Sequence, residues 1–192
     1  MCLDFVNTLD DRFHDVPKEL LASYLDLARF AGEAGILPQQ QVDRLCAQAV
    51  KSPHAAERAL KSAIRMREAM SEIFYARAQA RPVPKAALAV LNGYVQQAAQ
   101  HAALAPHHGG FQWQFDFPHD NLEAPLWPIA RSAAELLASD QLAFVRACAS
   151  ETCEWLFLDE TKNHRRRWCD MTKCGNRAKV RSFYERQKTA SE

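Results

Sequence analysis

Glycine is scarce in this chain: 6 of its 192 residues are Gly, or about 3% against an average usage of roughly 7%. This scarcity disfavours glycine-rich phosphate loops and all-β folds with many turns. The sequence lacks G-x-G-x-x-G, G-x-x-x-x-G-K-[ST], G-x-S-x-G and H-E-x-x-H, which mark dinucleotide, nucleotide, hydrolase and zincin sites. Its histidines are scattered and pair with no evident nucleophile, so we expect no enzymatic activity.

Long apolar stretches are also missing, since no run of about 18 apolar residues occurs. The first residues carry Asp4, Asp10 and Asp11, where a secretory signal needs a basic segment followed by an apolar one. We therefore expect a cytoplasmic protein with no membrane contact. In that reducing compartment the six cysteines are expected to be metal ligands or free thiols rather than a disulfide framework.

The charge is distributed unevenly along the chain. Residues 1–160 hold 14 Lys and Arg against 20 Asp and Glu, whereas residues 161–192 hold 10 against 3. An acidic body with a short basic end points to a polyanionic partner for that end, and a merely solvated basic tail is the alternative.

Hydrophobic periodicity predicts a mainly α protein with a small β element (α+β). Helices are expected to begin near Pro17, Pro38, Pro53, Pro84 and Pro125, because apolar residues recur three and four positions apart after each. Strict alternation from Phe111 to Phe117 predicts a strand, placing a strand or hairpin near 104–117. We predict a helical body over residues 1–142 and, docked on it, a C-terminal module over residues 143–192.

The strongest signal is the spacing C-x4-C-x15-C-x4-C, formed by Cys148, Cys153, Cys169 and Cys174. Two short cysteine pairs brought together by a hairpin offer four soft ligands to one structural Zn²⁺. Residues 155–159 are expected to form one strand of that hairpin and residues 165–168 the other, giving a treble-clef-like finger that ends in a basic helix. Two disulfides, or four independent core cysteines, are the alternatives. Cys2 and Cys46 are expected to be small buried hydrophobes.

Basic residues surround the second cysteine pair. On a helix after Cys174, Arg177, Arg181 and Lys188 share one face, while a stripe of Val180, Phe183 and Tyr184 is expected to pack on the finger or the body. Such cations favour double-stranded DNA, with RNA left open, and the alternatives are a protein-docking or self-association surface and a solvated face. The candidate nucleic-acid contacts are Arg165, Arg166, Arg167, Lys173, Arg177, Lys179, Arg181 and Lys188.

Polar residues also interrupt the apolar N-terminal segment. On a helix, Asp4, Asn7 and Thr8 share a face and need partners. Arg67, in a core register, and Arg131, near Trp127, are the candidates, and together the six residues would suit a small polar or anionic ligand. The alternative is a structural network of capping and salt-bridge contacts.

Two segments resemble known families. Trp155-Leu156-Phe157-Leu158-Asp159, Arg165-Arg166-Arg167-Trp168-Cys169 and above all Cys174-Gly175-Asn176-Arg177 resemble the CGNR zinc finger, and Cys2-Leu3-Asp4-Phe5-Val6-Asn7-Thr8-Leu9 is similar to the opening of the ABATE domain. The resemblance implies a zinc-dependent, DNA-binding module with the four cysteines as ligands, in bacterial proteins described as stress-induced transcription regulators. We expect such a regulator, whose body senses a ligand or mediates homo-oligomerisation; the alternative is a zinc-stabilised protein-interaction module without nucleic-acid binding.

Overall fold

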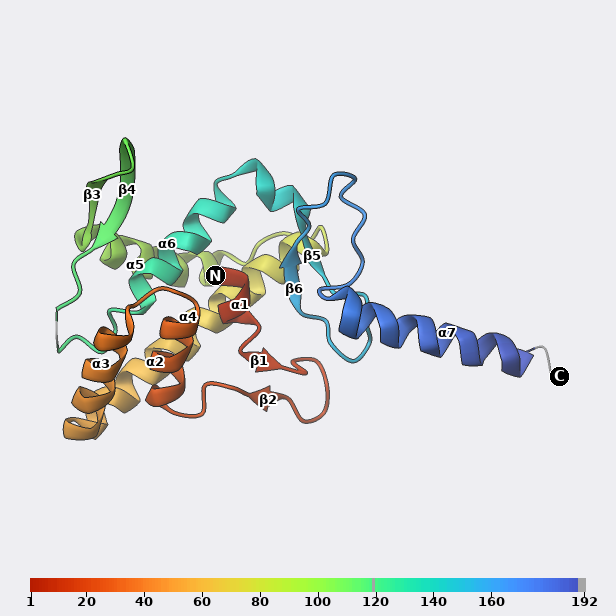
Figure 1. The fold of residues 1–192 in the computed structure, drawn as a ribbon, viewed down its shortest axis with the longest axis horizontal. Coiled ribbons are helices and arrows are strands. Elements are labelled where there is room, and N and C mark those ends of the chain that lie inside the picture. The colour runs from red at the N-terminus through yellow and green to blue at the C-terminus, as the bar shows by residue number, and fades with distance from the viewer. Residues whose placement is uncertain (119, 190–192) are drawn as a thin grey trace.

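A long helix, α4 (Pro53–Ala78), runs through the body, and shorter helices pack around it (Figure 1). The computed structural model describes residues 1–118 and 120–189, apart from the side chains of residues 185, 188 and 189. It is 56% helical with small sheets, which confirms the predicted fold class. The helices around α4 are α2 (Tyr24–Glu33), α3 (Gln39–Lys51), α5 (Lys85–Gln100) and α6 (Leu126–Leu137).

The sequence of α4 explains its central place. Pro53 occupies the first turn, where its missing N–H costs no hydrogen bond. Buried residues then recur at helical spacing through Ala59, Ala63, Met66 and Met70, and the alanines let neighbouring helices approach closely. The helices predicted near Pro38, Pro53, Pro84 and Pro125 are all present, and each begins within one residue of the proline named.

The helix predicted from Pro17 is wrong at its start, because α2 begins only at Tyr24. Ser23 and Asp26 form a capping box there, in which the Ser23 N–H donates to the Asp26 carboxylate at 2.9 Å. Residues before it are extended: β2 (Lys18–Glu19) pairs antiparallel with β1 (Leu9–Asp10). The extended backbone places the Glu19 carboxylate against Arg67 of α4, a contact that outweighs helix propensity.

The N-terminal helix α1 (Cys2–Val6) is short but central. It contacts α4, α6 and the strand β6 (Leu156–Leu158), so Phe5 and Val6 are completely buried. The helix ends at Val6, and Asn7 and Thr8 therefore do not share a helical face with Asp4 as the periodicity predicted.

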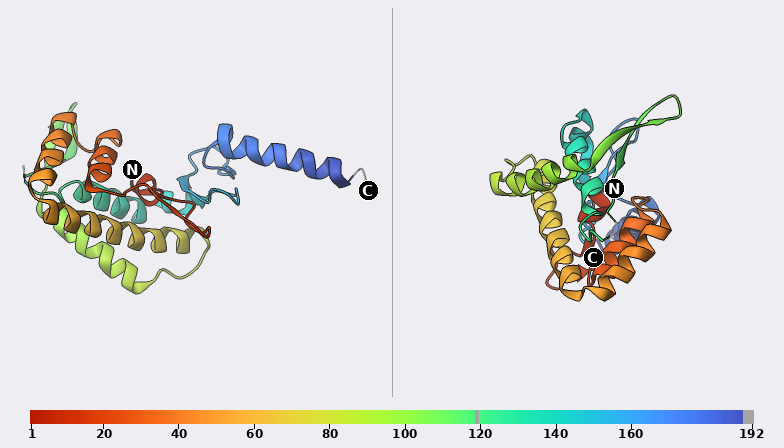
Figure 2. Two further views of the ribbon diagram at one scale, coloured as in Figure 1. Left: turned by 90° about the horizontal axis from the view of Figure 1, so that it is seen from below. Right: turned by 90° about the vertical axis from the view of Figure 1, so that its left-hand side faces the viewer.

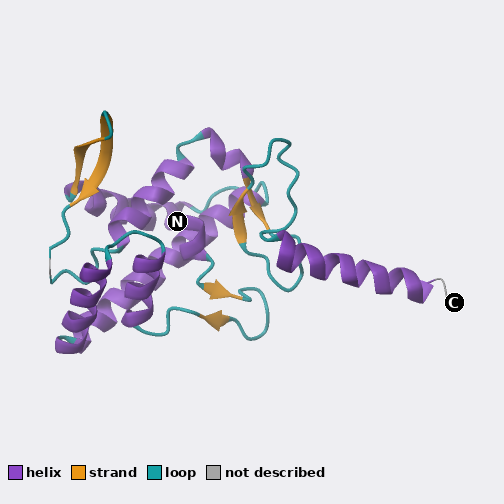
Figure 3. Ribbon diagram, viewed as in Figure 1, coloured by secondary structure: helices purple, strands orange, loops and turns teal. Residues whose placement is uncertain are grey.

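A β-hairpin extends from the body in the region predicted for a strand (Figure 3). Strands β3 (Ala102–His107) and β4 (Gly110–Phe115) pair antiparallel from Ala102↔Phe115 to His107↔Gly110. The two-residue turn places His108 at φ 45° and Gly109 at φ 79°, the left-handed values of a type I′ turn that matches strand twist.

The C-terminal module is built on a second hairpin, in which β5 (Val145–Ala147) pairs antiparallel with β6. The predicted strand over 155–159 is present as β6, but its expected partner over 165–168 is wrong. That segment is not a strand, because the Arg166 side chain binds the carbonyl oxygens of Trp168 and Cys169. Val145 and Leu156 belong to the same buried cluster as the body helices, so the module is docked on the body. The 3-10 turn η1 (Asp140–Phe144) connects α6 to β5, and the module also contains the π-helical turn η2 (Met171–Gly175) and helix α7 (Asn176–Thr189).

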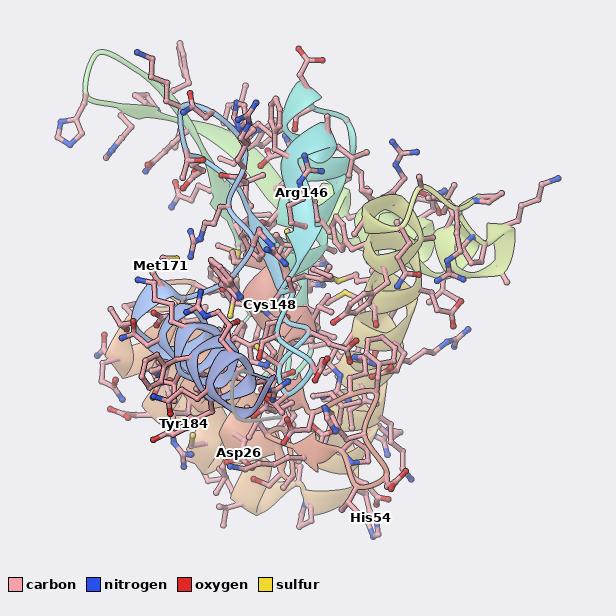
Figure 4. The ribbon with its side chains drawn as sticks, turned by 90° about the vertical axis from the view of Figure 1, so that its right-hand side faces the viewer. Asp26, His54, Arg146, Cys148, Met171 and Tyr184 are labelled. Carbon is pink, nitrogen blue, oxygen red and sulfur yellow. The ribbon has the colours of Figure 1, made fainter. Side chains whose placement is uncertain are left out.

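Helix α7 leaves the module and projects away from the body (Figures 1 and 2). Figure 4 looks nearly along it and shows side chains extending on several sides, Tyr184 among them. Val180, Phe183 and Tyr184 are 55%, 51% and 65% exposed, so the prediction that this stripe packs on the finger or body is wrong. Because α7 continues directly from η2, its direction is set by the turn and not by burial of the stripe. Among the described residues no helix has both the length and the hydropathy needed to cross a membrane.

Candidate metal centre and nucleic-acid interface

The four cysteines of the predicted metal site come together at the join between the second hairpin and α7. Cys148 directly follows β5, Cys153 lies shortly before β6, Cys169 precedes η2 and Cys174 lies within η2. Their Sγ atoms all lie within 4.8 Å of one another. The Cys153 and Cys169 sulfurs are 3.5 Å apart, and the Cys169 and Cys174 sulfurs are 3.8 Å apart.

These distances fit a tetrahedral ion and not disulfides. A disulfide places its sulfurs about 2.05 Å apart, and all four cysteines are free. Four thiolates about 2.3 Å from a tetrahedral Zn²⁺ lie about 3.8 Å from one another. The alternatives of two disulfides and of independent core cysteines therefore do not hold, and the donor set is that of a closed structural site.

Two Asp-x-Thr turns shape the backbone around this site, and the sequence reasoning missed both. The Asp159 carboxylate accepts hydrogen bonds from Thr161 N at 3.0 Å and from Thr161 Oγ1 at 2.6 Å. Asp170 makes the same pair of bonds with Thr172, at 2.7 Å each, and thereby caps η2. The repeated D-x-T motif was the signal that could have identified these turns, because Asp commonly bonds its own backbone two residues on.

Burial and charge act in opposite directions on the thiols. Burial raises the pKa of Cys153 to about 12 and raises the pKa of Cys169 well above its usual range. Burial also opposes ionisation of Cys174, but hydrogen bonds from Cys153, Cys169 and Arg177 outweigh it and lower the pKa of that thiol. A metal cation bound by the four sulfurs would supply the positive charge that keeps all of them deprotonated.

Arg177 is the cation nearest to the sulfurs. Its Nη2 donates to Cys174 Sγ at 3.4 Å and its Nη1 to Thr152 Oγ1 at 3.4 Å. The hydrogen bond to Cys174 raises the pKa of Arg177, so its charge is secure. Four thiolates around a divalent ion carry a net charge of −2, and Arg177 offsets part of it.

Among the described residues, four hydrogen bonds between three pairs of residues fasten the module to the body. The Asn7 amide donates to Leu156 O and accepts from Leu156 N, both at 2.9 Å. Trp155 Nε1 donates to Asp10 at 2.7 Å, and Tyr75 Oη donates to the Glu154 carbonyl at 2.8 Å. Together with the shared core they hold the metal site at a fixed place beside the N-terminal segment.

This architecture agrees with two family models. Residues 1–140 match ABATE, described as "Putative stress-induced transcription regulator", and residues 145–187 match the CGNR zinc finger. The chain belongs to the ABATE family. In this ABATE protein the gap between the two matches contains the predicted division at residues 142 and 143. A comparison with curated proteins gave no match.

The cations predicted to contact nucleic acid differ in whether other groups of the finger already bind them. Some are engaged in the finger: Arg166 binds backbone carbonyls, Arg177 the metal site, and Arg181 pairs with Glu151. Arg167 is exposed, with its guanidinium 5.3 Å from the Trp168 ring centre. Others are exposed and form no ion pair within residues 1–118 and 120–189, namely Arg165, Lys173 and Lys179. The side chain of Lys188 lies outside the described part of the structure.

The six residues predicted to line one ligand pocket lie in separate places. The Asp4 side chain is 71% exposed and pairs with the N-terminal amine at 2.7 Å. Asp4 and Asn7 line a cavity of about 490 Å³ beside the finger, to which Lys173 and Arg177 also contribute. The predicted single pocket is therefore not formed.

The remaining pocket residues are used in structural contacts. Arg67 is 2% exposed, makes two bonds to Glu19 at 2.6 and 2.7 Å, and donates to Thr8 Oγ1 at 3.3 Å. Trp127 stacks on His101, with ring centres 3.7 Å apart. Arg131 instead lies 3.8 Å over the ring of Trp113 in β4. Thr8 and Arg67 thus belong to the structural network that was the alternative interpretation.

Proposed function

We propose that this ABATE protein is a DNA-binding transcription regulator whose CGNR finger is held in shape by one structural Zn²⁺. Cys148, Cys153, Cys169 and Cys174 bind the ion, and their soft thiolates favour Zn²⁺ over the hard cations Mg²⁺ and Ca²⁺. A closed four-thiolate site leaves no open coordination position, so the proposal includes no catalytic step. The family description supports the regulatory part, including the link to stress.

The observation that carries the DNA-binding proposal is the projecting basic helix α7. An α-helix fits the major groove of B-form DNA, and α7 stands clear of the body (Figure 2). Lys179 and Arg186, seven positions apart, lie on one face of the helix, away from the Arg177 and Arg181 side that contacts the finger. Lys173 adds an exposed cation in η2, directly before α7, and Arg165 adds one in the loop that precedes η2.

Salt-dependent binding to duplex DNA tests this proposal. If four phosphates are neutralised, the logarithm of the binding constant should fall against the logarithm of salt concentration with a slope of about −3.6. Lys173→Ala and Lys179→Ala should each flatten the slope by about 0.9. Fluorescence anisotropy with labelled duplex between about 50 and 200 mM salt measures this. Lys51→Ala, which removes an exposed cation from the end of α3, is the matched control and should leave the slope unchanged.

A second candidate function is supported by the exposed apolar residues of α7. Val180, Phe183 and Tyr184 offer the aromatic and aliphatic groups that protein partners bury. A protein-interaction module would show no salt slope on DNA and no effect of Lys179→Ala. Phe183→Ala would then weaken partner binding instead. Binding that lacks a salt slope contradicts the DNA-binding proposal and favours this alternative.

We propose no small-ligand sensing role for the body, because four of the six residues expected to line a ligand pocket make structural contacts. Thr8 and Arg67 are hydrogen-bonded to each other, and Arg67 is also held by Glu19. Trp127 stacks on His101, and Arg131 lies over the ring of Trp113 in the β3–β4 hairpin.

A further inference from the structure

Along the outer edge of β4, the backbone N–H and C=O groups have no hydrogen-bond partner within residues 1–118 and 120–189. The bond from Asp116 N to His101 O, at 2.9 Å, continues the β3–β4 ladder. In an antiparallel ladder, residue pairs that exchange hydrogen bonds alternate with pairs that do not, and this bond shows which pairs are which. Gln112 and Gln114 therefore direct their backbone groups toward β3, whereas Phe111, Trp113 and Phe115 direct theirs outward. Within the described ranges these outward groups have no hydrogen-bond partner, and β4 is exposed along its length except at Phe115.

The edge also lacks the features with which proteins protect exposed strands. Natural edge strands usually carry charges, prolines or bulges that prevent pairing with another chain. No Asp, Glu, Lys or Arg occurs between residues 102 and 115. The opposite edge, that of β3, is interrupted because Pro106 has no N–H to offer outward. The edge of β4 is thus the one suited to pairing.

The hairpin has an apolar face that the body leaves partly open. Leu104, Phe111 and Trp113 lie on the same face and are 59%, 76% and 44% exposed. Arg131 covers part of the Trp113 ring, but the tip of the hairpin extends beyond the body (Figure 1). An isolated two-stranded hairpin is marginally stable in water, so additional strands would stabilise it.

We infer that β4 pairs antiparallel with β4 of a second copy of this chain, forming a four-stranded sheet across a two-fold axis at Trp113. The sequence of Phe111–Phe115, F-Q-W-Q-F, reads the same in both directions about that residue. Trp113 faces Trp113 of the second copy, Phe111 faces Phe115, and Gln112 faces Gln114. The outward groups of Phe111, Trp113 and Phe115 all find partners in this register, and the two exposed apolar faces become continuous.

Chemical symmetry is what selects a second copy as the partner. An isologous interface requires a surface that complements itself, and an uncharged strand with matched aromatic and amide positions meets this requirement. The paired strands are short, so we expect a concentration-dependent dimer and not an obligate one. The pairing involves no residue of the metal centre or of α7 and does not depend on the proposed DNA binding.

Charge substitutions at Gln112 and Gln114 test both the pairing and its register. Both side chains are exposed and point away from the apolar face, so the variants should fold. Gln112→Lys combined with Gln114→Lys places like charges opposite each other twice and should weaken dimerisation about tenfold. Gln112→Lys combined with Gln114→Glu places opposite charges together and should restore it. Ala103→Lys with His107→Lys, on the same face of β3, is the matched control and should keep the dimer.

The measurement is sedimentation equilibrium of the full chain, purified with its metal, from about 1 μM to about 1 mM. The expected result is a mass that rises from 21.7 kDa toward twice that value as concentration increases. A wild-type protein that stays monomeric throughout overturns the inference. So does a dimer that the double lysine variant leaves intact, or one that the lysine–glutamate variant fails to restore. Binding of an unrelated extended peptide to β4 by a monomeric chain would identify a different partner and also overturn it.

Discussion

Asn7 and Leu156 are 149 positions apart in the sequence and joined by two hydrogen bonds of 2.9 Å. The Asn7 amide acts as one further peptide unit beside β6, donating to the carbonyl and accepting from the N–H of the same residue. Both residues are buried. A single side chain of the ABATE body thus satisfies both backbone groups of Leu156, three residues after Cys153 in the CGNR finger.

We predict that Asn7→Ala lowers the free energy of unfolding by about 1–3 kcal/mol, because it leaves a buried N–H and a buried carbonyl without partners. Urea denaturation followed by tryptophan fluorescence measures the change. Asn163→Ala, at an exposed position in the finger, is the control and should stay within about 0.5 kcal/mol of wild type. Equal stability of the two variants would show that the Asn7 bonds do not fasten the finger.

Metal removal should affect the body as well as the finger. Val145 and Leu156 pack in the body core, so loss of the finger fold uncovers apolar surface of the body. We expect one Zn²⁺ per chain, and a lower thermal midpoint after chelation or in Cys153→Ser and Cys169→Ser, since structural zinc contributes about 10–16 kcal/mol of apparent binding energy in finger peptides.

Elemental analysis measures the zinc content per chain, and thermal unfolding followed by far-UV circular dichroism measures the midpoint. Cys46→Ser, at a partly buried cysteine outside the cluster, is the control and should keep its metal. A metal-free protein with an unchanged melting curve would contradict the prediction.

The parts of this structure that follow from local patterns were predictable from the sequence. The paired spacing of Cys148, Cys153, Cys169 and Cys174 identified the cluster because two short loops bring ligands together with little dependence on the rest of the chain. The helices from Pro38 onward followed from apolar periodicity and proline at the first turn.

The parts that failed depend on tertiary contacts. Lys18–Glu19 is extended because Glu19 reaches Arg67, which lies 48 positions away. The direction of α7 depends on the η2 turn. The exposure of its apolar stripe could not be predicted from helical periodicity, because an amphipathic sequence has the same pattern whether its apolar face is buried or exposed. Charge counting also could not separate cations that brace the finger, such as Arg166 and Arg177, from cations such as Lys179 that form no ion pair with a described residue.

The ion pair between Glu19 and Arg67 should make stability depend on pH in the acid range. Burial raises the pKa of Glu19, but the hydrogen bonds and charge of Arg67 outweigh it, and the net pKa lies below the ordinary value of 4.5. A carboxylate whose pKa is lowered by folding contributes its full stability above the unfolded value and loses it as pH falls through the folded value.

We therefore expect Glu19→Gln to be less stable than wild type by about 1–3 kcal/mol near neutral pH, which is below the cost for a fully buried pair because Glu19 is 34% exposed. The difference should be constant above about pH 5 and shrink at lower pH. Urea unfolding of both proteins over this range measures it, and the subtraction removes the pH dependence of metal binding. Glu72→Gln, at an exposed carboxylate of α4, should show little difference. A difference independent of pH would contradict the assignment.

The last prediction separates the two roles of cations on α7. Arg177 donates to Cys174 Sγ, whereas Lys179, two positions later, is exposed and free of ion pairs within the described ranges. Removing a side chain that is hydrogen-bonded to a metal ligand typically weakens metal binding about 10–100-fold, because that side chain holds the ligand in place and offsets its charge. We expect Arg177→Ala to weaken zinc binding by about that factor, and Lys179→Ala to leave it unchanged.

Competition with a chromophoric zinc chelator measures this affinity for both variants and for Arg177→Lys. Because lysine keeps the charge but not the forked geometry, Arg177→Lys should fall between wild type and Arg177→Ala. On DNA the order should reverse at saturating zinc: Lys179→Ala flattens the salt slope, while Arg177→Ala changes it less because its guanidinium is held by Cys174 and Thr152. Zinc affinity that is the same in Arg177→Ala and Lys179→Ala would show that Arg177 does not support the metal centre and would return it to the set of DNA-contacting cations.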